Sequence, residues 1–162
     1  MWPYVVLSLF TLQRISELLL SRSNTAKLLA AGAEEVGAEH YPVIVAFHSL
    51  WLLGLWILAP AQVYSWALIA VLVILQALRA WVIFSLGQRW TTRIIRVPHE
   101  KLIESGLYQY HRHPNYIVVV VEIFVLPLAF GLVAYAVIGG LINIGIVAWR
   151  IRAENAALAL LR

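Results

Sequence analysis

The residues best suited to chemistry lie in one short segment, Gly-Leu-Tyr-Gln-Tyr-His-Arg-His-Pro-Asn-Tyr, at positions 106–116. Its proline, Pro114, is favoured in the first turn of a helix, where the missing N–H costs nothing. A helix that begins there presents free N–H groups and a positive dipole end, which suit the carboxylate of an amino-acid-like cofactor. Tyr108, Tyr110 and Tyr116 add flat surfaces for an adenine ring or a sulfonium. The same pattern is equally typical of an aromatic belt at a membrane interface.

Four ionisable residues, Arg14, Glu17, Arg79 and Glu122, interrupt stretches that are otherwise apolar. Placing such a group in a membrane costs about 2.5–3.5 kcal/mol, so each indicates a partner, a wet cavity or a function. Arg14 and Glu17 lie three residues apart and can pair on one helix face. The two arginines can equally extend toward the headgroups. Glu122 follows four valines and must face the protein interior, a cavity, or a partner such as Arg79 or Arg14.

The composition is that of a membrane protein. Of the 162 residues, 62% are hydrophobic and 12% are charged, whereas a soluble domain is about 45–50% apolar and about 25% charged. Seven Trp and seven Tyr fit the aromatic belts of membrane interfaces. The chain has no Cys and no Asp, which excludes thiolate sites and many carboxylate metal sites, and no metal ligand set is evident. The net charge of +4 does not indicate nucleic acid, because no soluble basic domain carries it.

Five stretches are long and apolar enough, or nearly so, to cross a bilayer as helices, which takes about 17–25 residues. They cover residues 2–20, 43–59, 63–86, 116–130 and 134–149. The last two are short and joined by a turn at Gly131, so they form either a spanning hairpin or a partly re-entrant one. The first has no basic start and contains Arg14 and Glu17, which argues for a retained span and against a signal peptide. We therefore predict an all-α polytopic membrane protein with about five transmembrane helices.

The basic residues predict the orientation. Ten of the twelve Lys and Arg residues fall in segments that five spans place on one side, at 21–42, 87–115 and after 149. The opposite side has none. By the positive-inside rule the N-terminus lies outside and the C-terminus is cytosolic, as expected in a bacterial inner membrane. Segment 21–42 is expected to hold a short amphipathic helix and a turn, and the longer segment 87–115 is expected to carry function.

The motif Gly-x-Tyr-x-x-x-Arg-His-Pro-x-Tyr at 106–116 resembles the signature of isoprenylcysteine carboxyl methyltransferases and related membrane methyltransferases. A second family element, an arginine followed four residues later by Glu-Glu-x-x-Leu, corresponds to Arg150 and Glu154. Asn155 stands in place of the second glutamate, so a role that depends on that carboxylate is not carried over. The resemblance covers about residues 87–162.

The resemblance implies a single integral membrane methyltransferase domain over 1–162, with N-terminal spans at 2–86 and a catalytic part at 87–162. This part would comprise a cytosolic cofactor-binding loop and a short C-terminal helix. The implied cofactor is S-adenosyl-L-methionine, and the residues implied to contact it are Leu102, Ile103, Tyr108, His113, Pro114, Asn115, Tyr116 and Glu154. Arg150 matches the arginine that holds the anionic group of the substrate. Arg150 and Glu154 are four residues apart and share a helix face, which agrees with this assignment.

The N-terminal half is similar to a bacterial branch of the family. The segments Gln-Arg-Ile-Ser-Glu-Leu at 13–18 and Glu-His-Tyr-Pro at 39–42, together with Glu122, carry this likeness. Members of that branch are associated with type III polyketide synthases and O-methylate alkylpyrone or alkylresorcinol lipids. The resemblance thus implies a lipophilic acceptor that enters from the bilayer, with an isoprenylcysteine as the alternative. Further candidate substrate-binding residues are Arg14, Glu17 and His40.

Methyl transfer from a sulfonium is an in-line displacement that depends mainly on positioning, with the nucleophile about 3–3.5 Å from the methyl carbon. Exclusion of water assists it. Arg150 would orient the acceptor oxygen, and a carboxylate or an acidic enol needs no strong base. For a less acidic hydroxyl, Glu122 is the candidate base and His40 is the next candidate.

Two alternatives come from other classes of protein. A small transporter or channel subunit would account for the charges inside the spans, but it leaves the segment at 106–116 and the Arg150–Glu154 pair unexplained. A membrane reductase with a related C-terminal fold would bind NADPH, and the sequence has no glycine-rich dinucleotide fingerprint.

Overall fold

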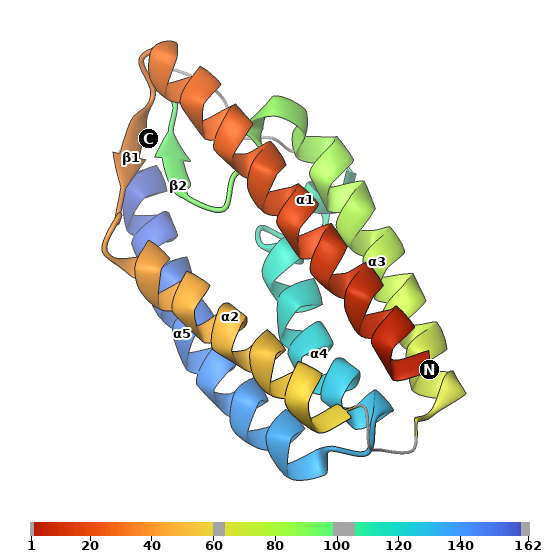
Figure 1. Ribbon diagram of the computed structural model, residues 1–162. Helices are drawn as coiled ribbons and strands as arrows, with labels where there is room; N and C mark the ends of the chain where they lie inside the picture. Colours follow the sequence, from red (N-terminus) through yellow and green to blue (C-terminus); the bar gives the residue numbers. More distant parts are fainter. Residues whose placement is uncertain (1, 60–63, 99–105, 160–162) are drawn as a thin grey trace.

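The computed structural model describes residues 2–59, 64–98 and 106–159. Most of them form the helices α1 (Trp2–Ala30), α2 (His40–Leu58), α3 (Trp66–Leu86), α4 (Pro114–Ala129) and α5 (Val133–Ala159), drawn in Figure 1. The short elements are the strands β1 (Glu34–Val36) and β2 (Ile94–Arg96) and the 3₁₀ turns η2 (Gly87–Arg89) and η3 (Gly106–Gln109). Helix α4 packs against α3 and α5, and α2 packs against α1 and α5. The predicted all-α polytopic fold is confirmed.

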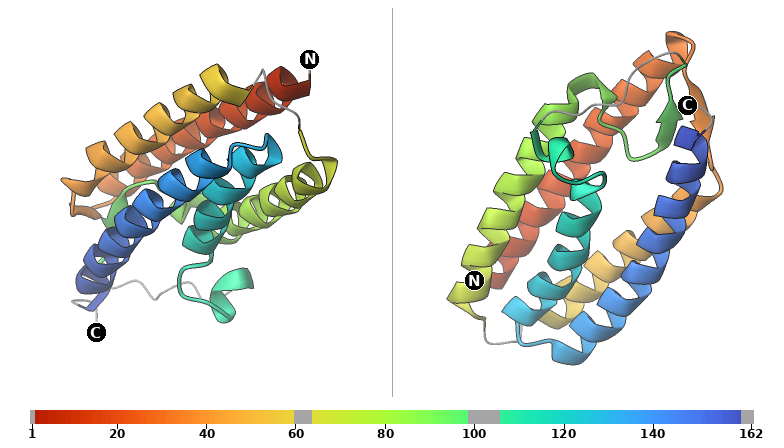
Figure 2. Two further views of the ribbon diagram at one scale, coloured as in Figure 1. Left: turned by 90° about the horizontal axis from the view of Figure 1, so that it is seen from below. Right: turned by 180° about the vertical axis from the view of Figure 1, so that it is seen from behind.

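Four helices, α1, α2, α3 and α5, are long and apolar enough to cross a membrane. The fourth predicted span, now α4, is shorter, with 16 residues. At a rise of 1.5 Å per residue it is about 24 Å long, less than a bilayer core of about 30 Å. Figures 1 and 2 show that it begins part-way along the bundle, well short of the ends of α1 and α3. The turn to α5 lies at Gly131, as predicted, and its φ of 71° is one that glycine adopts readily.

Helix α1 is longer than the predicted first span. It continues through residues 21–30, because this stretch has no proline or glycine to end it. The sequence predicts a separate short helix in this segment, and that prediction is wrong. The extension holds the segment that follows α3. Asn24 donates from Nδ2 to the carbonyl oxygens of Gly87, at 3.2 Å, and Trp90, at 2.9 Å. The Ser21 hydroxyl lies 2.8 Å from that of Thr92.

A two-stranded antiparallel sheet, which the sequence analysis did not predict, joins the two loops at this end of the bundle. Its register sets Glu34 opposite Arg96 and Val36 opposite Ile94. Glu34 pairs with Arg96, and Arg93 donates from Nη1 to both carboxylate oxygens of Glu35 at 2.7 and 2.8 Å. Both strands contact α5. The sheet therefore ties the α1–α2 and α3–α4 connections to the C-terminal part of α5.

Glycine residues let α5 approach α4 and α2 closely. A Cβ added at Gly140 would lie 2.1 Å from the Phe124 ring, and one added at Gly54 would lie 2.2 Å from Tyr135 Oη. Tyr135 in turn donates to the carbonyl oxygen of Trp51 at 2.8 Å. Close packing around small residues is a main source of helix association in lipid. It fixes α5 against α2 and α4.

Gly54→Ala tests the contact between α2 and α5. The Tyr135 hydroxyl cannot retreat from the new methyl group without losing its bond to Trp51. We expect a loss of about 1–3 kcal/mol in unfolding free energy, measured on the purified protein in detergent. Gly145→Ala is the matched control, because an added Cβ there meets nothing within 4 Å. Equal losses in the two variants would contradict the explanation.

Candidate active site

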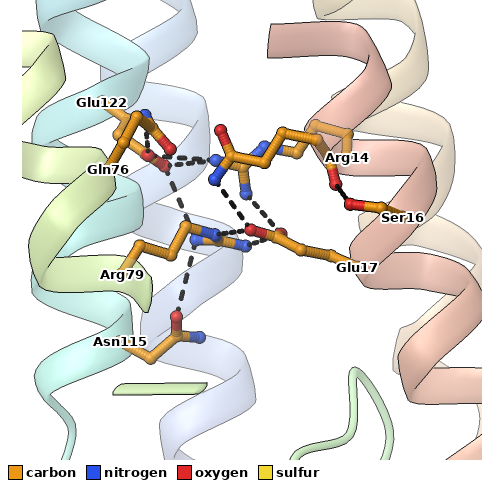
Figure 3. Close-up of polar contacts among 8 residues, drawn as sticks. Arg14, Ser16, Glu17, Gln76, Arg79, Asn115 and Glu122 are labelled. Carbon is orange, nitrogen blue, oxygen red and sulfur yellow. Dashed lines mark hydrogen bonds and ion pairs between the residues drawn. The ribbon is translucent and has the colours of Figure 1, made fainter. Parts of the chain in front are cut away.

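The four charged residues inside the spans meet in one network that joins α1, α3 and α4 (Figure 3). Arg79 holds Glu17 with two bonds, from Nε to Oε1 at 2.6 Å and from Nη2 to Oε2 at 2.7 Å. Arg14 donates from Nη2 to both oxygens of Glu122 at 3.0 Å and from Nη1 to Glu17 at 3.1 Å. Gln76 completes the set, with its amide 2.7 Å from Glu122 Oε1. We call these five residues the ion-pair network.

The ion-pair network explains how these charges tolerate burial. Side-chain exposure is 3% for Glu122 and 7% for both Glu17 and Arg79, and 19% for Arg14. The charges of the two arginines and the two glutamates cancel. Each charge also has an opposite charge in hydrogen-bond contact, which offsets the cost of desolvation. The predicted pairing of Arg14 with Glu17 is confirmed. The charges therefore do not require a transport function.

The contacts of Glu122 favour a structural role. Its carboxylate accepts from Arg14 and Gln76, and Arg79 Nη1 lies 3.5 Å from Oε2. To remove a substrate proton it would have to leave these partners. Its role as a base therefore stays a prediction, as do substrate contacts for Arg14 and Glu17.

A second polar cluster forms where the first turn of α4 meets the C-terminal part of α5. The Tyr116 hydroxyl accepts from Arg150 Nε at 2.7 Å and donates to Glu154 Oε2 in a short hydrogen bond. The His113 ring stacks on Tyr116, with centroids 5.5 Å apart, and its Nδ1 lies 3.9 Å from Glu154. Its Nε2 lies 3.3 Å from Oδ1 of Asn155, the residue that replaces the second glutamate of the family pattern. Both predicted motifs thus converge on one site, the Tyr116 cluster.

Arg150 keeps donors available at this site. Its Nε serves Tyr116, and its guanidinium carbon lies 5.6 Å from the centre of that ring. In the part of the chain that the structure describes, neither terminal nitrogen of Arg150 has a hydrogen-bond partner. Paired N–H groups of this kind suit a carboxylate or another planar anion.

Tyr108 approaches the Tyr116 cluster from η3. Burial and the negative charge of Glu154 raise the pKa of the Tyr108 phenol, so this side chain stays neutral at physiological pH. Gly106 begins η3 with a φ of +61°, and a Cβ there would lie 2.4 Å from Ser85 Oγ on α3. The glycine of the motif is thus required both for its backbone conformation and for close contact with α3. Tyr110, by contrast, is 72% exposed.

Three of the candidate residues lie elsewhere or cannot be placed. The His40 ring contacts that of Trp149 on α5 in a tilted arrangement, with centroids 4.1 Å apart, and its Nδ1 lies 2.9 Å from the carbonyl oxygen of Gly37. Its role in substrate binding stays a prediction. Leu102 and Ile103 lie outside the described residues.

Asn115 connects the two clusters. It is the second residue of α4, and its Oδ1 lies 3.5 Å from Arg79 Nη1. The sequence analysis missed this link, as well as Gln76. The spacing of Gln76 and Arg79, three residues apart on an apolar helix, was the available signal, since it places them on one face.

Arg14→Gln tests the balance of charge in the ion-pair network. The substitution leaves Glu122 without its nearest cation, and we expect a loss of about 3–5 kcal/mol in unfolding free energy, measured in detergent. The double variant Arg14→Met with Glu122→Met removes both charges and should be less destabilised than Arg14→Gln. If the double variant loses as much stability as the single variants Arg14→Met and Glu122→Met lose together, the two charges do not compensate each other.

Comparison with known proteins identifies the family. Residues 67–160 match the isoprenylcysteine carboxyl methyltransferase (ICMT) family, a range that adds α3 to the segment recognised from its motifs. The chain is 35% identical over 160 residues to the uncharacterized protein YpbQ of Bacillus subtilis, covering 96% of this chain and 95% of YpbQ. It is 29% identical over 152 residues to an uncharacterized protein of Haemophilus influenzae, covering 90% and 88%. No solved structure is significantly similar. The chain belongs to the isoprenylcysteine carboxyl methyltransferase family and is an integral membrane methyltransferase.

Proposed function

We propose that the protein transfers a methyl group from S-adenosyl-L-methionine to an oxygen atom of a lipophilic acceptor. The observation that best supports the proposal is the Tyr116 bridge. It holds Arg150 and Glu154 together at the N-terminal end of α4, so one site presents free cationic donors, a carboxylate and aromatic faces. S-adenosylmethionine would supply an electrophilic methyl group on a sulfonium.

The residues around the Tyr116 cluster fit this cofactor chemically. The first turn of α4 offers a positive dipole end for its carboxylate, although the Tyr116 N–H in that turn already donates to the carbonyl oxygen of His113 at 3.2 Å. The rings of Tyr108, His113 and Tyr116 offer flat surfaces for the adenine and for the sulfonium. Glu154 supplies an acceptor for its ammonium or ribose hydroxyl groups. Pro114 and Asn115 complete the set on α4, and Leu102 and Ile103 would add apolar contacts.

Arg150 is the proposed anchor for the acceptor. Its two terminal nitrogens would hold and orient an anionic oxygen, and positioning of this kind is the largest contribution that the protein can make to a displacement. A carboxylate or acidic enol is already ionised and needs no base. We infer an alkylpyrone or a related polyketide lipid as the preferred acceptor, and an isoprenylcysteine is the alternative. Glu122 or His40 would have to act only on a less acidic hydroxyl.

The acceptor would reach the site from the bilayer. Large apolar side chains such as Leu53, Phe84 and Leu141 are exposed on the outer faces of the helices, where lipid would surround them. The short α4 sets the Tyr116 cluster below the ends of α1 and α3 (Figure 2), so an alkyl tail can remain in lipid while its polar head is methylated.

Donor binding is the first test. In detergent, calorimetry should detect S-adenosylhomocysteine but not NADPH. Glu154→Gln should weaken that binding about 10- to 100-fold, because one charge-assisted hydrogen bond contributes about 1.5–3 kcal/mol. With labelled donor and a panel of alkylpyrones, prenylcysteines and phospholipids, we expect label in the alkylpyrones, and Arg150→Gln should abolish it. Binding of neither methyl-donor species would overturn the proposal, and label only in prenylcysteine would overturn the preferred acceptor.

We also propose that the N-terminus lies outside and the C-terminus in the cytosol of an inner membrane. The chain has no Cys, so single substitutions give clean probes. In intact cells a membrane-impermeant maleimide should label Val133→Cys, beside the α4–α5 turn, and spare His111→Cys until the membrane is opened. Both side chains are exposed. The reverse labelling pattern would overturn the orientation.

A further inference from the structure

Arg79 makes one contact that the ion-pair network does not need. Its Nε and Nη2 are both committed to Glu17. The remaining nitrogen, Nη1, lies 3.5 Å from Oε2 of Glu122 and 3.5 Å from Oδ1 of Asn115 (Figure 3). These two residues are seven apart on α4, so one nitrogen of Arg79 spans two turns of that helix. This nitrogen therefore links the buried charges to the first turn of α4, which forms part of the candidate active site.

The chemistry of a guanidinium decides which way the Asn115 amide points. Arginine has only donors, so the atom of Asn115 that faces it must be the oxygen. The Nδ2 group is then turned away from the ion-pair network, and among the described residues it has no hydrogen-bond partner. It adds two N–H donors to the positive dipole end of α4, where the backbone N–H of Tyr116 already donates to the carbonyl oxygen of His113.

Arg79 is held firmly enough to impose this orientation. Only 7% of its side chain is exposed, and Glu17 binds its guanidinium at two atoms. On another side its guanidinium carbon lies 5.8 Å from the centre of the Trp90 ring, in the segment that Asn24 ties to α1. A bidentate pair of this kind fixes the plane of the guanidinium as well as its position.

We propose that Arg79 is a positioning residue for the methyl donor, because it orients Asn115 so that Nδ2 donates to the carboxylate of S-adenosylmethionine. This inference rests on the proposed function. With the opposite orientation, the amide oxygen would face the carboxylate and repel it. Buried charges inside the helix bundle thereby act on the cofactor site without touching the cofactor.

Binding of two probes to four proteins tests the proposal. The probes are S-adenosylhomocysteine and decarboxylated S-adenosylmethionine, which lacks the carboxylate. The proteins are the full-length wild type, Asn115→Ala, Arg79→Lys and the control Gln76→Leu. Gln76 lies one turn from Arg79 on α3 and contacts Glu122 but not Asn115. Calorimetry in detergent gives the affinities, and thermal unfolding shows that each variant is folded.

We expect Asn115→Ala and Arg79→Lys to weaken S-adenosylhomocysteine binding about 10- to 100-fold, the loss of a hydrogen bond to a charged group. Lysine keeps the charge, but one ammonium cannot serve Glu17 and Asn115 together. Binding of the decarboxylated probe should change little. The double variant of Arg79→Lys and Asn115→Ala should be no weaker than Asn115→Ala, because both changes remove the same interaction. Gln76→Leu should bind both probes as the wild type does.

Several outcomes would overturn the inference and leave the proposed function intact. They are additive losses in the double variant, equal losses for both probes, and a loss in Gln76→Leu that matches Arg79→Lys. If Arg79→Lys does not fold, Asn115→Asp carries the test, because an aspartate can still pair with Arg79 but cannot donate. Its affinity for S-adenosylhomocysteine must then fall at least as far as that of Asn115→Ala. A wild type that binds neither probe would instead overturn the proposed function.

Discussion

The pair between Arg79 and Glu17 is the interaction on which the rest of the structure depends. Inside a bilayer a lone charge is expensive, so each of these two residues requires the other, and the pair needs the second pair of Arg14 and Glu122 beside it. Since the four residues come from α1, α3 and α4, the requirement for neutral pairing fixes the relative position of three helices. It also fixes where along α3 the helix α4 begins, and with it the first turn that carries the Tyr116 cluster.

At the other end of the site, the C-terminal part of α5 has further contacts outside the apolar core. The two-stranded sheet and the extension of α1 hold the loops against the C-terminal part of α5, where Arg150 and Glu154 lie. The N-terminal half therefore takes part in the candidate site although the family motifs lie in the C-terminal half. It places both motifs and supplies Glu17, the partner of Arg79. Under the proposed role of Arg79, the polar residues of α1 would influence a site that they do not touch.

Much of this arrangement could be predicted from the sequence, because hydropathy, the turn at Gly131 and the spacing of Arg14 and Glu17 are local patterns. The features that escaped prediction depend on distant residues. Glu17 and Arg79 are 62 residues apart, and nothing in either segment specifies the other. Strands of three residues carry no period long enough to recognise, and Glu34 pairs with Arg96 from a segment far away in the sequence. Whether α4 spans fully or belongs to a partly re-entrant hairpin stayed open, because composition does not reveal where a helix starts relative to its neighbours.

The shortness of α4 has a consequence for selectivity. A helix about 6 Å shorter than the hydrocarbon core does not reach the headgroups on both sides, and the N-terminal end of α4, which carries the Tyr116 cluster, lies short of the ends of α1 and α3. For the proposed acceptor, which keeps its tail in lipid, such a site would select molecules by the distance of the reactive oxygen from the bilayer midplane. The length of the tail would be free to vary, because surplus carbon stays in the membrane. A thicker or thinner bilayer would change which molecules place the reactive oxygen at the site, without any change in the protein.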